Sequence, residues 1–282
     1  MNLPFALDLT GKTVVVTGAG GVLCSSFAEA AARCGAKVAL LDINLEAAEK
    51  NAAAIREAGF EAKAYQTNVL EKESLQAARD AILKDFGPCD ILINGAGGNN
   101  ARANTTKDYY IPEDTEEGIV TFFDLDPKGV EFVFNLNFLG VLLPTQVFAK
   151  DMVGRDGATI INISSMNAFT PLTRIPAYSG AKAAVSNFTQ WLATHFSKAG
   201  IRVNAIAPGF FLTNQNRNLL LNPDGTYSAR AEKIVAGTPM GRFGEPEELL
   251  GTLQFLMNDK ASGFVNGVVI PVDGGFNAYS GV

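Results

Sequence analysis

The chain is poor in cysteine and histidine and has no run of basic residues. Its three cysteines, Cys24, Cys34 and Cys89, show no C-x-x-C spacing, which argues against disulfides and against a zinc site. The formal net charge is -6, so nucleic acid is an unfavourable partner. We therefore expect a protein of the reducing cytoplasm that binds neither metal nor nucleic acid.

Targeting and membrane signals are also lacking. The first eight residues, MNLPFALD, contain neither a basic leader nor an apolar core, so we expect no signal peptide. We find no apolar run that approaches the roughly 20 residues of a membrane-spanning helix. The 282 residues are 47% hydrophobic and 18% charged, which suits a single globular domain over residues 1–282.

Short buried strands alternate with helical patterns along the chain. Strands are expected at residues 13–17, 37–41, 62–66, 90–93, 160–163, 201–207 and 268–272. Helices are expected at 22–33, 45–58, 74–86, 130–153, 178–198 and 247–257, with a break or kink near Pro144. This order predicts an α/β fold, a Rossmann-type doubly wound parallel sheet of about seven strands with helices on both faces. Two irregular segments, at about 98–128 and 209–244, are expected to form the substrate side.

The stretch from Thr159 to Lys182 carries the most specific chemistry. Ser165 follows a buried strand, Tyr178 comes thirteen residues later, and Lys182 lies four residues further on, on the same helix face. A phenol titrates near ~10, and a nearby ammonium favours the phenolate and lowers its pKa. With the serine hydroxyl, the pair is suited to hold a carbonyl or alcohol oxygen and to pass it a proton. Alone, Tyr-x-x-x-Lys is better interpreted as an exposed helix pair.

A glycine-rich turn after the first strand predicts a dinucleotide site. Gly18, Gly20 and Gly21 precede a helix, where backbone N–H groups attract a pyrophosphate. Asp42 ends the second strand roughly 20 residues further on, where a carboxylate binds the adenosine ribose and repels a 2′-phosphate. This favours NAD over NADP. The alternatives are an ordinary glycine turn and a helix-capping aspartate.

These motifs, in this order, resemble the short-chain dehydrogenase/reductase family over essentially the whole chain. The motifs are Thr17-Gly18, Asn94-Gly-Ala-Gly97, Asn137, Ser165, Tyr178-x-x-x-Lys182, Pro208-Gly209-x-x-x-Thr213 and Asp273-Gly-Gly. Within the family, the segments 87–98, 166–173 and 273–282 are most similar to the D-mannonate oxidoreductase (fructuronate reductase-like) group, with gluconate 5-dehydrogenases as near neighbours.

The resemblance implies roles for individual residues. Tyr178 would be the general acid in reduction, Lys182 would lower its pKa and hold the nicotinamide ribose, Ser165 would bind the reacting oxygen, and Asn137 would keep a water beside Lys182. The NAD(H) site would comprise Gly18, Gly20, Gly21, Val22, Leu23, Asp42, Ile43, Asn68, Val69, Asn94, Ala96, Gly97, Tyr178, Lys182, Pro208, Gly209, Phe211 and Thr213. The family also suggests a homotetramer in which helices 130–153 and 178–198 pack between subunits.

Two positions depart from the family pattern. Val22 and Cys24 stand where the family's first turn usually has glycines, and Cys24 is small enough for close helix packing. Asn68 stands where an aspartate is common near the adenine, and its amide can still donate a hydrogen bond.

The substrate is less defined by the sequence. A sugar acid needs a cation for its carboxylate, ideally a bidentate arginine, and Arg102, Arg174 and Arg217 lie in segments near the carboxyl edge of the sheet. Asn167 is a candidate for a sugar hydroxyl. His195, the only histidine, is interpreted as structural or interfacial. Three functions remain open: a fructuronate–mannonate oxidoreductase, an oxidoreductase of gluconate or another polyol, and a non-catalytic dinucleotide-binding regulator.

Overall fold

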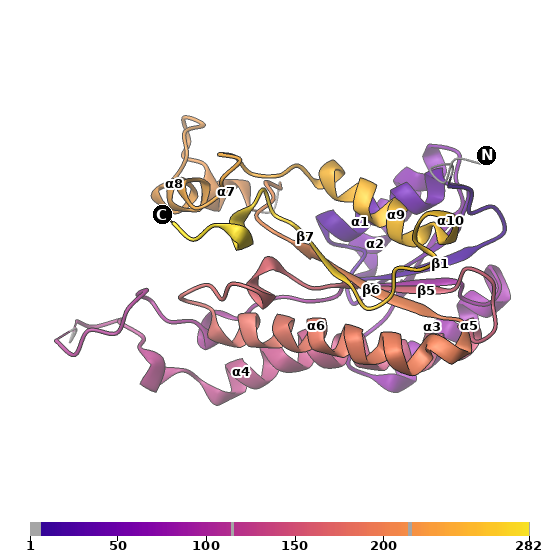
Figure 1. Cartoon of the computed structure of the whole chain (residues 1–282), viewed down its shortest axis with the longest axis horizontal. Coiled ribbons are helices and arrows are strands. Elements are labelled where there is room, and N and C mark those ends of the chain that lie inside the picture. The colour runs from indigo at the N-terminus through magenta and orange to yellow at the C-terminus, as the bar shows by residue number, and fades with distance from the viewer. Residues whose placement is uncertain (1–6, 114–115, 214–215, 282) are drawn as a thin grey trace.

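A computed structural model describes residues 7–113, 116–213 and 216–281, and its centre is one parallel sheet (Figure 1). The strand order is β3-β2-β1-β4-β5-β6-β7, and every neighbouring pair is parallel. The strands are β1 (Thr13–Thr17), β2 (Lys37–Asp42), β3 (Ala62–Gln66), β4 (Ile91–Asn94), β5 (Thr159–Ile163), β6 (Arg202–Pro208) and β7 (Val269–Val272). The order reverses between β1 and β4, which is where open sheets of this kind bind their ligands.

Helices cover both faces of the sheet, as the sequence predicted (Figure 1). The residues packed on one face come from α1 (Val22–Arg33), α2 (Leu45–Glu57) and α9 (Leu250–Met257). Those on the other face come from α3 (Lys72–Asp85), α5 (Gly140–Met152) and α6 (Pro176–Phe196). The central strands β1, β4 and β5 are buried along their whole length, which explains why they are continuous apolar runs rather than alternating ones.

The helix predicted at 130–153 is present, but its start and the position of its irregular turn differ from the prediction. It begins earlier, as α4 (Pro127–Phe134), and widens into a π turn at Asn135–Leu139 before α5 begins. The helix runs through Pro144, so the break expected there is wrong, and the irregular turn lies at Asn135–Leu139 instead. A proline removes one N–H donor from the helix, whereas the π turn is built around the side chain of Asn137, described below.

The stretch Pro127–Met152 also corrects the expectation about membrane spans. Within the described part of the chain it is the one helix that is long and apolar enough to cross a membrane, by length and composition only. Half of its most apolar window is buried, and α5 packs against α3 and the strands of the sheet. It therefore has the burial of a core helix, since such helices are apolar for the same reason.

The two predicted irregular segments lie at the carboxyl end of the strands. The first contains the 3₁₀ turns η1 (Ala101–Ala103) and η2 (Phe122–Asp124), and the second contains α7 (Arg217–Leu220) and α8 (Ala229–Ala236). In Figure 1 both project from the same end of the molecule. The other short elements are η4 (Met166–Ala168), η5 (Ser197–Ala199), η6 (Pro246–Leu249), α10 (Asp259–Ser262) and η7 (Phe276–Ala278). Residues 1–6, on which the signal-peptide prediction depends, and Asn214 and Gln215 lie outside the described residues.

Candidate active site

The structure brings Ser165, Tyr178 and Lys182 together at the carboxyl end of β5. Pro176 is the first residue of α6, where a missing N–H has no cost, and this start places Tyr178 and Lys182 one turn apart. Ser165 caps η4, where its hydroxyl accepts a hydrogen bond from the N–H of Asn167 at 3.3 Å. Ser165 also hydrogen-bonds the Tyr178 phenol. The predicted serine–tyrosine pair is therefore formed.

Lys182 is buried, at 4% exposure, and its ammonium is held by backbone. Its Nζ donates to the carbonyl of Ile163 at 2.8 Å and lies 5.6 Å from the centre of the Tyr178 ring. The Ser164 hydroxyl donates to the Lys182 carbonyl at 3.1 Å, which fixes this turn of α6 against β5. Burial lowers the pKa of Lys182 to about 8, because desolvation penalises the charged form.

Burial also raises the pKa of Tyr178, and the hydrogen bond from Ser165 only partly opposes this shift. The sequence predicted the opposite direction, with Lys182 lowering the pKa of the phenol. The desolvation of the phenolate is the larger effect on the Tyr178 pKa and outweighs the hydrogen bond with Ser165, while the Lys182 ammonium is bonded to the Ile163 carbonyl. Tyr178 therefore holds its proton, which is the form required of a general acid.

Asn137 lies inside the π turn and is fully buried. Its Nδ2 donates to the carbonyls of Val133, at 2.8 Å, and Gly98, at 2.7 Å, while its Oδ1 accepts from the Gly98 N–H at 3.3 Å. A Cβ added to Gly97 would lie 2.7 Å from Asn137 Oδ1 and 3.2 Å from Lys182 Nζ. Asn137 therefore fastens the loop after β4 beside Lys182, and π turns of this kind are frequent at functional sites.

The turn after β1 fits the pyrophosphate of a dinucleotide. Gly18 has φ +71°, and a Cβ there would lie 2.8 Å from the Ala96 backbone, so a glycine is required. Gly21 is the N-cap of α1 without a side-chain cap, and the first turn, which begins Val22-Leu23, has no acidic residue. The N–H groups of Val22 and Leu23 at the start of α1 therefore remain available to an anion.

Asp42 lies beside this turn at the end of β2. Its carboxylate accepts hydrogen bonds from the N–H groups of Gly20 and Asn44, each at 2.9 Å. This places a negative charge next to the phosphate turn, which suits a ribose hydroxyl and opposes a 2′-phosphate. Ile43, the next residue, is 65% exposed.

Asn68 has its polar groups engaged within the protein. Its amide donates to Glu71 at 2.9 Å, and its oxygen accepts from the Leu70 N–H at 3.0 Å. The neighbouring Val69 is buried. The structure thus gives Asn68 a role in the turn before α3, and the donor expected for the adenine is already bonded.

Cys24 packs against Gly95 in the loop after β4. A Cβ added to Gly95 would lie 2.2 Å from Cys24 Sγ. Cys24 of α1 stands where the family usually has a glycine, and Gly95 of the facing loop has no side chain. The absent side chain of Gly95 leaves room for the Cys24 sulfur, so α1 can still pack close to the sheet.

Asn94 turns its side chain into the core. Its Nδ2 donates to Thr145 at 3.0 Å and to Asn162 at 2.9 Å. Gly95 and Ala96 donate their N–H groups to the Thr17 hydroxyl. The backbone of this loop, with Gly97, is therefore well placed for a cofactor, but the Asn94 side chain supports the loop from inside.

The loop after β6 is held by contacts with the end of β7 and the residue that follows it. The Gly209 N–H donates to Val272 at 2.9 Å, and a Cβ at Gly209 would lie 2.6 Å from Asp273 Cα. The Thr213 N–H donates to Asn216 at 2.8 Å. Pro208, Gly209 and Thr213 thus occupy one tight loop at the carboxyl edge, where the sequence predicted the carboxamide end of the cofactor.

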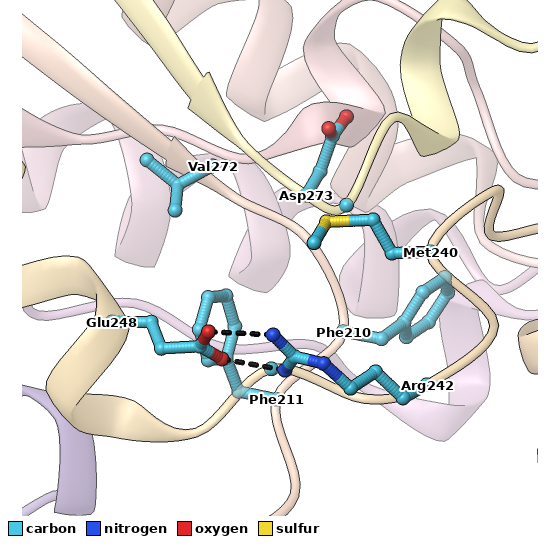
Figure 2. Close-up of a pocket in the computed structure, with 9 residues that line it drawn as sticks. Phe210, Phe211, Met240, Arg242, Glu248, Val272 and Asp273 are labelled. Carbon is cyan, nitrogen blue, oxygen red and sulfur yellow. Dashed lines mark hydrogen bonds and ion pairs between the residues drawn. The ribbon is translucent and has the colours of Figure 1, made fainter.

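Phe211 points away from this loop into a small cavity of about 90 Å³ (Figure 2). Arg242 and Glu248 form a two-fold ion pair across it, with both N–O distances 2.7 Å, and this pairing lowers the pKa of Glu248 to about 2. Asn137, Ser165, Tyr178 and Lys182 do not line this cavity. We therefore infer that the residues around this cavity support the loop rather than take part in catalysis, and that the Phe211 side chain serves packing.

The predicted substrate residues have different surroundings. Arg102 pairs with Asp126 at 3.1 Å, and Arg174 pairs with Asp108 at 2.8 Å. Arg217 begins α7 and is exposed. Asn167 is 4% exposed, and its Oδ1 has no hydrogen-bond partner among the described residues. Sequence reasoning missed Asp108 and its second partner, Lys233, because no spacing relates residues 125 positions apart.

Comparison with known proteins identifies the family. The model of the short chain dehydrogenase family matches residues 12–223. A crystal structure from Haemophilus influenzae with bound NAD, provisionally named a D-mannonate oxidoreductase, is 63% identical and superposes with a TM-score of 0.95, covering 100% of both chains. An uncharacterized oxidoreductase, UxuB, of Bacillus subtilis is 53% identical over 99% of this chain and 100% of its own. The 5-keto-D-gluconate 5-reductase of Escherichia coli K12 is 32% identical over 95% and 96%.

The chain therefore belongs to the short-chain dehydrogenase family and is an oxidoreductase that uses a nicotinamide dinucleotide. The predicted family, fold, enzyme class and cofactor are confirmed. The enzyme class of the family argues against the non-catalytic regulator, and Ser165, Tyr178 and Lys182 lie together in the geometry described above.

Proposed function

We propose that this enzyme interconverts D-fructuronate and D-mannonate with NAD(H). The observation that carries the proposal is the position of Arg174, a cation four residues before Tyr178 in the connection from β5 to α6. On a chain of net charge -6, a cation at this point favours a substrate with a carboxylate. The provisional name of the 63% identical structure supports the same substrate.

The residues divide the reaction between them. The nicotinamide supplies or accepts the hydride. Ser165 donates a hydrogen bond to the carbonyl oxygen of the substrate, and Tyr178 gives that oxygen its proton. The Lys182 ammonium holds the ribose end of the cofactor and supports the phenolate that remains. Asn137 keeps the loop at Gly98 in place beside Lys182 and takes part in proton supply. Asn167, with its buried free oxygen, accepts from a substrate hydroxyl.

A second candidate is the reduction of 5-keto-D-gluconate. The 32% identical Escherichia coli relative carries that activity in its name. Fructuronate and 5-ketogluconate are both hexonates with a ketone at the fifth carbon, and they differ only in the configuration of the second carbon. The catalytic residues act on the ketone and cannot distinguish them. Residues at the carboxylate end must therefore set the choice between the two.

We also propose a cytoplasmic homotetramer. Trp191 on α6 is 56% exposed, and Phe132 and Phe134 on α4 are 43% and 38% exposed. Exposed aromatic side chains on the predicted interface helices favour association. His195 stacks on Trp191 with ring centres 4.6 Å apart, which agrees with an interfacial role.

The test is NADH consumption by the purified enzyme, followed by absorbance. D-Fructuronate and 5-keto-D-gluconate are compared, each with NADH and with NADPH. We expect turnover with NADH and fructuronate, and at least tenfold lower kcat/KM with the other ketone or with NADPH. Preference for 5-ketogluconate would overturn the substrate, and preference for NADPH would overturn the role given to Asp42.

A further inference from the structure

Asp108 joins three segments that are distant in sequence. It lies in the first irregular segment and is 16% exposed. Its Oδ1 accepts from the Thr173 hydroxyl at 2.9 Å and from Arg174 Nε at 2.8 Å, both in the connection from β5 to α6. Its Oδ2 accepts from Lys233 of α8. In Figure 1, α8 lies above the carboxyl edge of the sheet, and α4, which follows the Asp108 segment, lies below it. The carboxylate thus ties the two sides together.

This group is continuous with the catalytic site. The Thr105 N–H donates to the Arg174 carbonyl at 3.0 Å. Two residues earlier, Ala103 packs in one cluster with Ala177 and Tyr178. The segment that carries Asp108 therefore runs along the start of α6, next to the phenol.

The group contains two cations for one carboxylate. Arg174 binds Asp108 through Nε, and its two terminal nitrogens have no hydrogen bond within the described residues. Lys233 has three N–H donors, and its one described contact is with Asp108. The hydrogen bonds of these three neighbours keep the pKa of Asp108 well below its usual range, so the carboxylate is charged at any working pH. One positive charge of this group is therefore left over, beside the start of α6.

We propose that Arg174 and Lys233, oriented by Asp108, form the subsite that binds the carboxylate of the substrate. The inference rests on the proposed function and adds to it a second cation, from α8, and a positioning residue. With Nε engaged, the two terminal nitrogens of Arg174 present the pair of donors that binds a carboxylate end-on. The substrate's carboxylate supplies the missing anion and completes a group of two cations and two anions.

The subsite also couples substrate binding to α8. A carboxylate between Arg174 and Lys233 bonds to both sides of the entrance, so an acidic substrate holds α8 in the position described here. A ketose without the carboxylate lacks this contact. Asp108 contributes by holding the cations close together, which reduces the ordering cost of binding.

The test compares an acidic and a neutral substrate of the same length. D-Fructose is D-fructuronate with a hydroxymethyl group in place of the carboxylate. For Lys233→Met we expect the KM for fructuronate to rise about tenfold with kcat within twofold, and the kinetics with fructose to stay unchanged. For Asp108→Asn, which keeps the shape and removes the charge, we expect a rise in KM of about threefold to tenfold for the acid alone.

Arg230→Gln is the matched control, since it removes one charge from the same helix without touching Asp108. We expect it to leave both substrates unaffected. Equal losses with fructuronate and fructose, or an unchanged KM in Lys233→Met, would overturn the subsite. These outcomes differ from failure of the proposed function, in which the unmodified enzyme itself would show no preference for fructuronate or 5-ketogluconate over fructose. In that case the subsite would fall as well.

Discussion

Tyr178 owes its chemistry to its packing rather than to its charge partner. Its pKa is raised by burial, while the pKa of Lys182 is lowered to about 8. The two groups therefore coexist as a protonated phenol and a mostly charged ammonium at neutral pH. This combination favours proton donation to a carbonyl oxygen, the direction of ketone reduction.

Replacement of Tyr178 by Phe should remove the proton donor and leave the site otherwise intact. We expect kcat to fall by about 10²–10⁴-fold, the usual contribution of a positioned acid. NADH affinity, measured by fluorescence titration, should change by less than threefold, because the ring and Lys182 remain. A variant that keeps a tenth of its turnover would show that another group donates the proton.

The pH dependence should report Lys182. Because the pKa of Tyr178 is raised, the phenol stays protonated where Lys182 titrates. The ammonium is present below pH about 8 and is lost above it, so kcat/KM for reduction should be flat near neutrality and fall as the pH passes this value. In Lys182→Arg, whose side chain does not titrate in this range, the fall should move to higher pH. An unchanged profile in that variant would assign the decline to another group.

Residues related by short spacing were predictable, and residues related only through space were not. The positions of Ser165, Tyr178 and Lys182 follow from a strand end and one helical turn. The direction of the Tyr178 pKa shift depends on how much protein covers the phenol, which no spacing encodes. Asp108 and Lys233 meet across 125 residues, and their pairing appears only once both irregular segments are folded over the sheet.

At the scale of elements, the π turn shows how a local irregularity serves the site. The side-chain amide of Asn137 donates to the carbonyl of Val133, four residues earlier. The same amide group reaches Gly98, so the widened turn directs a polar side chain into the loop after β4. The sequence indicated Asn137 by its position in the motif series, but a π turn has no propensity signal and the break was predicted at Pro144.

The contact between α1 and the loop after β4 predicts a specific coupling. In Gly95→Ala the new Cβ would lie 2.2 Å from Cys24 Sγ, and overpacking of this kind costs about 1–3 kcal/mol. Cys24→Ala removes the sulfur, and its own Cβ lies 3.7 Å from the new atom. We therefore expect the double variant to be more stable towards urea than Gly95→Ala alone.

Gly251→Ala in α9 is the control for this series, because a Cβ there meets nothing within 4 Å. It should leave stability unchanged or raise it slightly, since alanine favours a helix over glycine. Additive effects of Cys24→Ala and Gly95→Ala would mean that the two residues do not share the space described here.

At the scale of the whole molecule, the fold was almost fully predictable. Most strands are short apolar runs that end at or next to a glycine, proline or aspartate, and right-handed crossovers then leave few topologies for a parallel sheet. The same topology collects the strand ends β1, β2, β4 and β5 at one edge, so motifs scattered between Thr17 and Lys182 become one site. Boundaries differed by a few residues, mostly at helix starts, where caps rather than periodicity decide.

Assembly into the proposed tetramer should stabilise the position of α6. α6 carries Tyr178 and Lys182 on its inner side and the exposed Trp191 further along. Trp191→Glu places a charge in the proposed interface, where an unpaired buried charge is costly, so we expect light scattering to show a species smaller than a tetramer. Leu83→Glu on α3, where the side chain is 43% exposed, should leave the assembly intact.

If contacts with partner subunits hold α6 in position, the dissociated Trp191→Glu variant should also have a lower kcat. Full activity in a dissociated enzyme would show that the Ser164 and Ile163 contacts alone suffice to position Lys182.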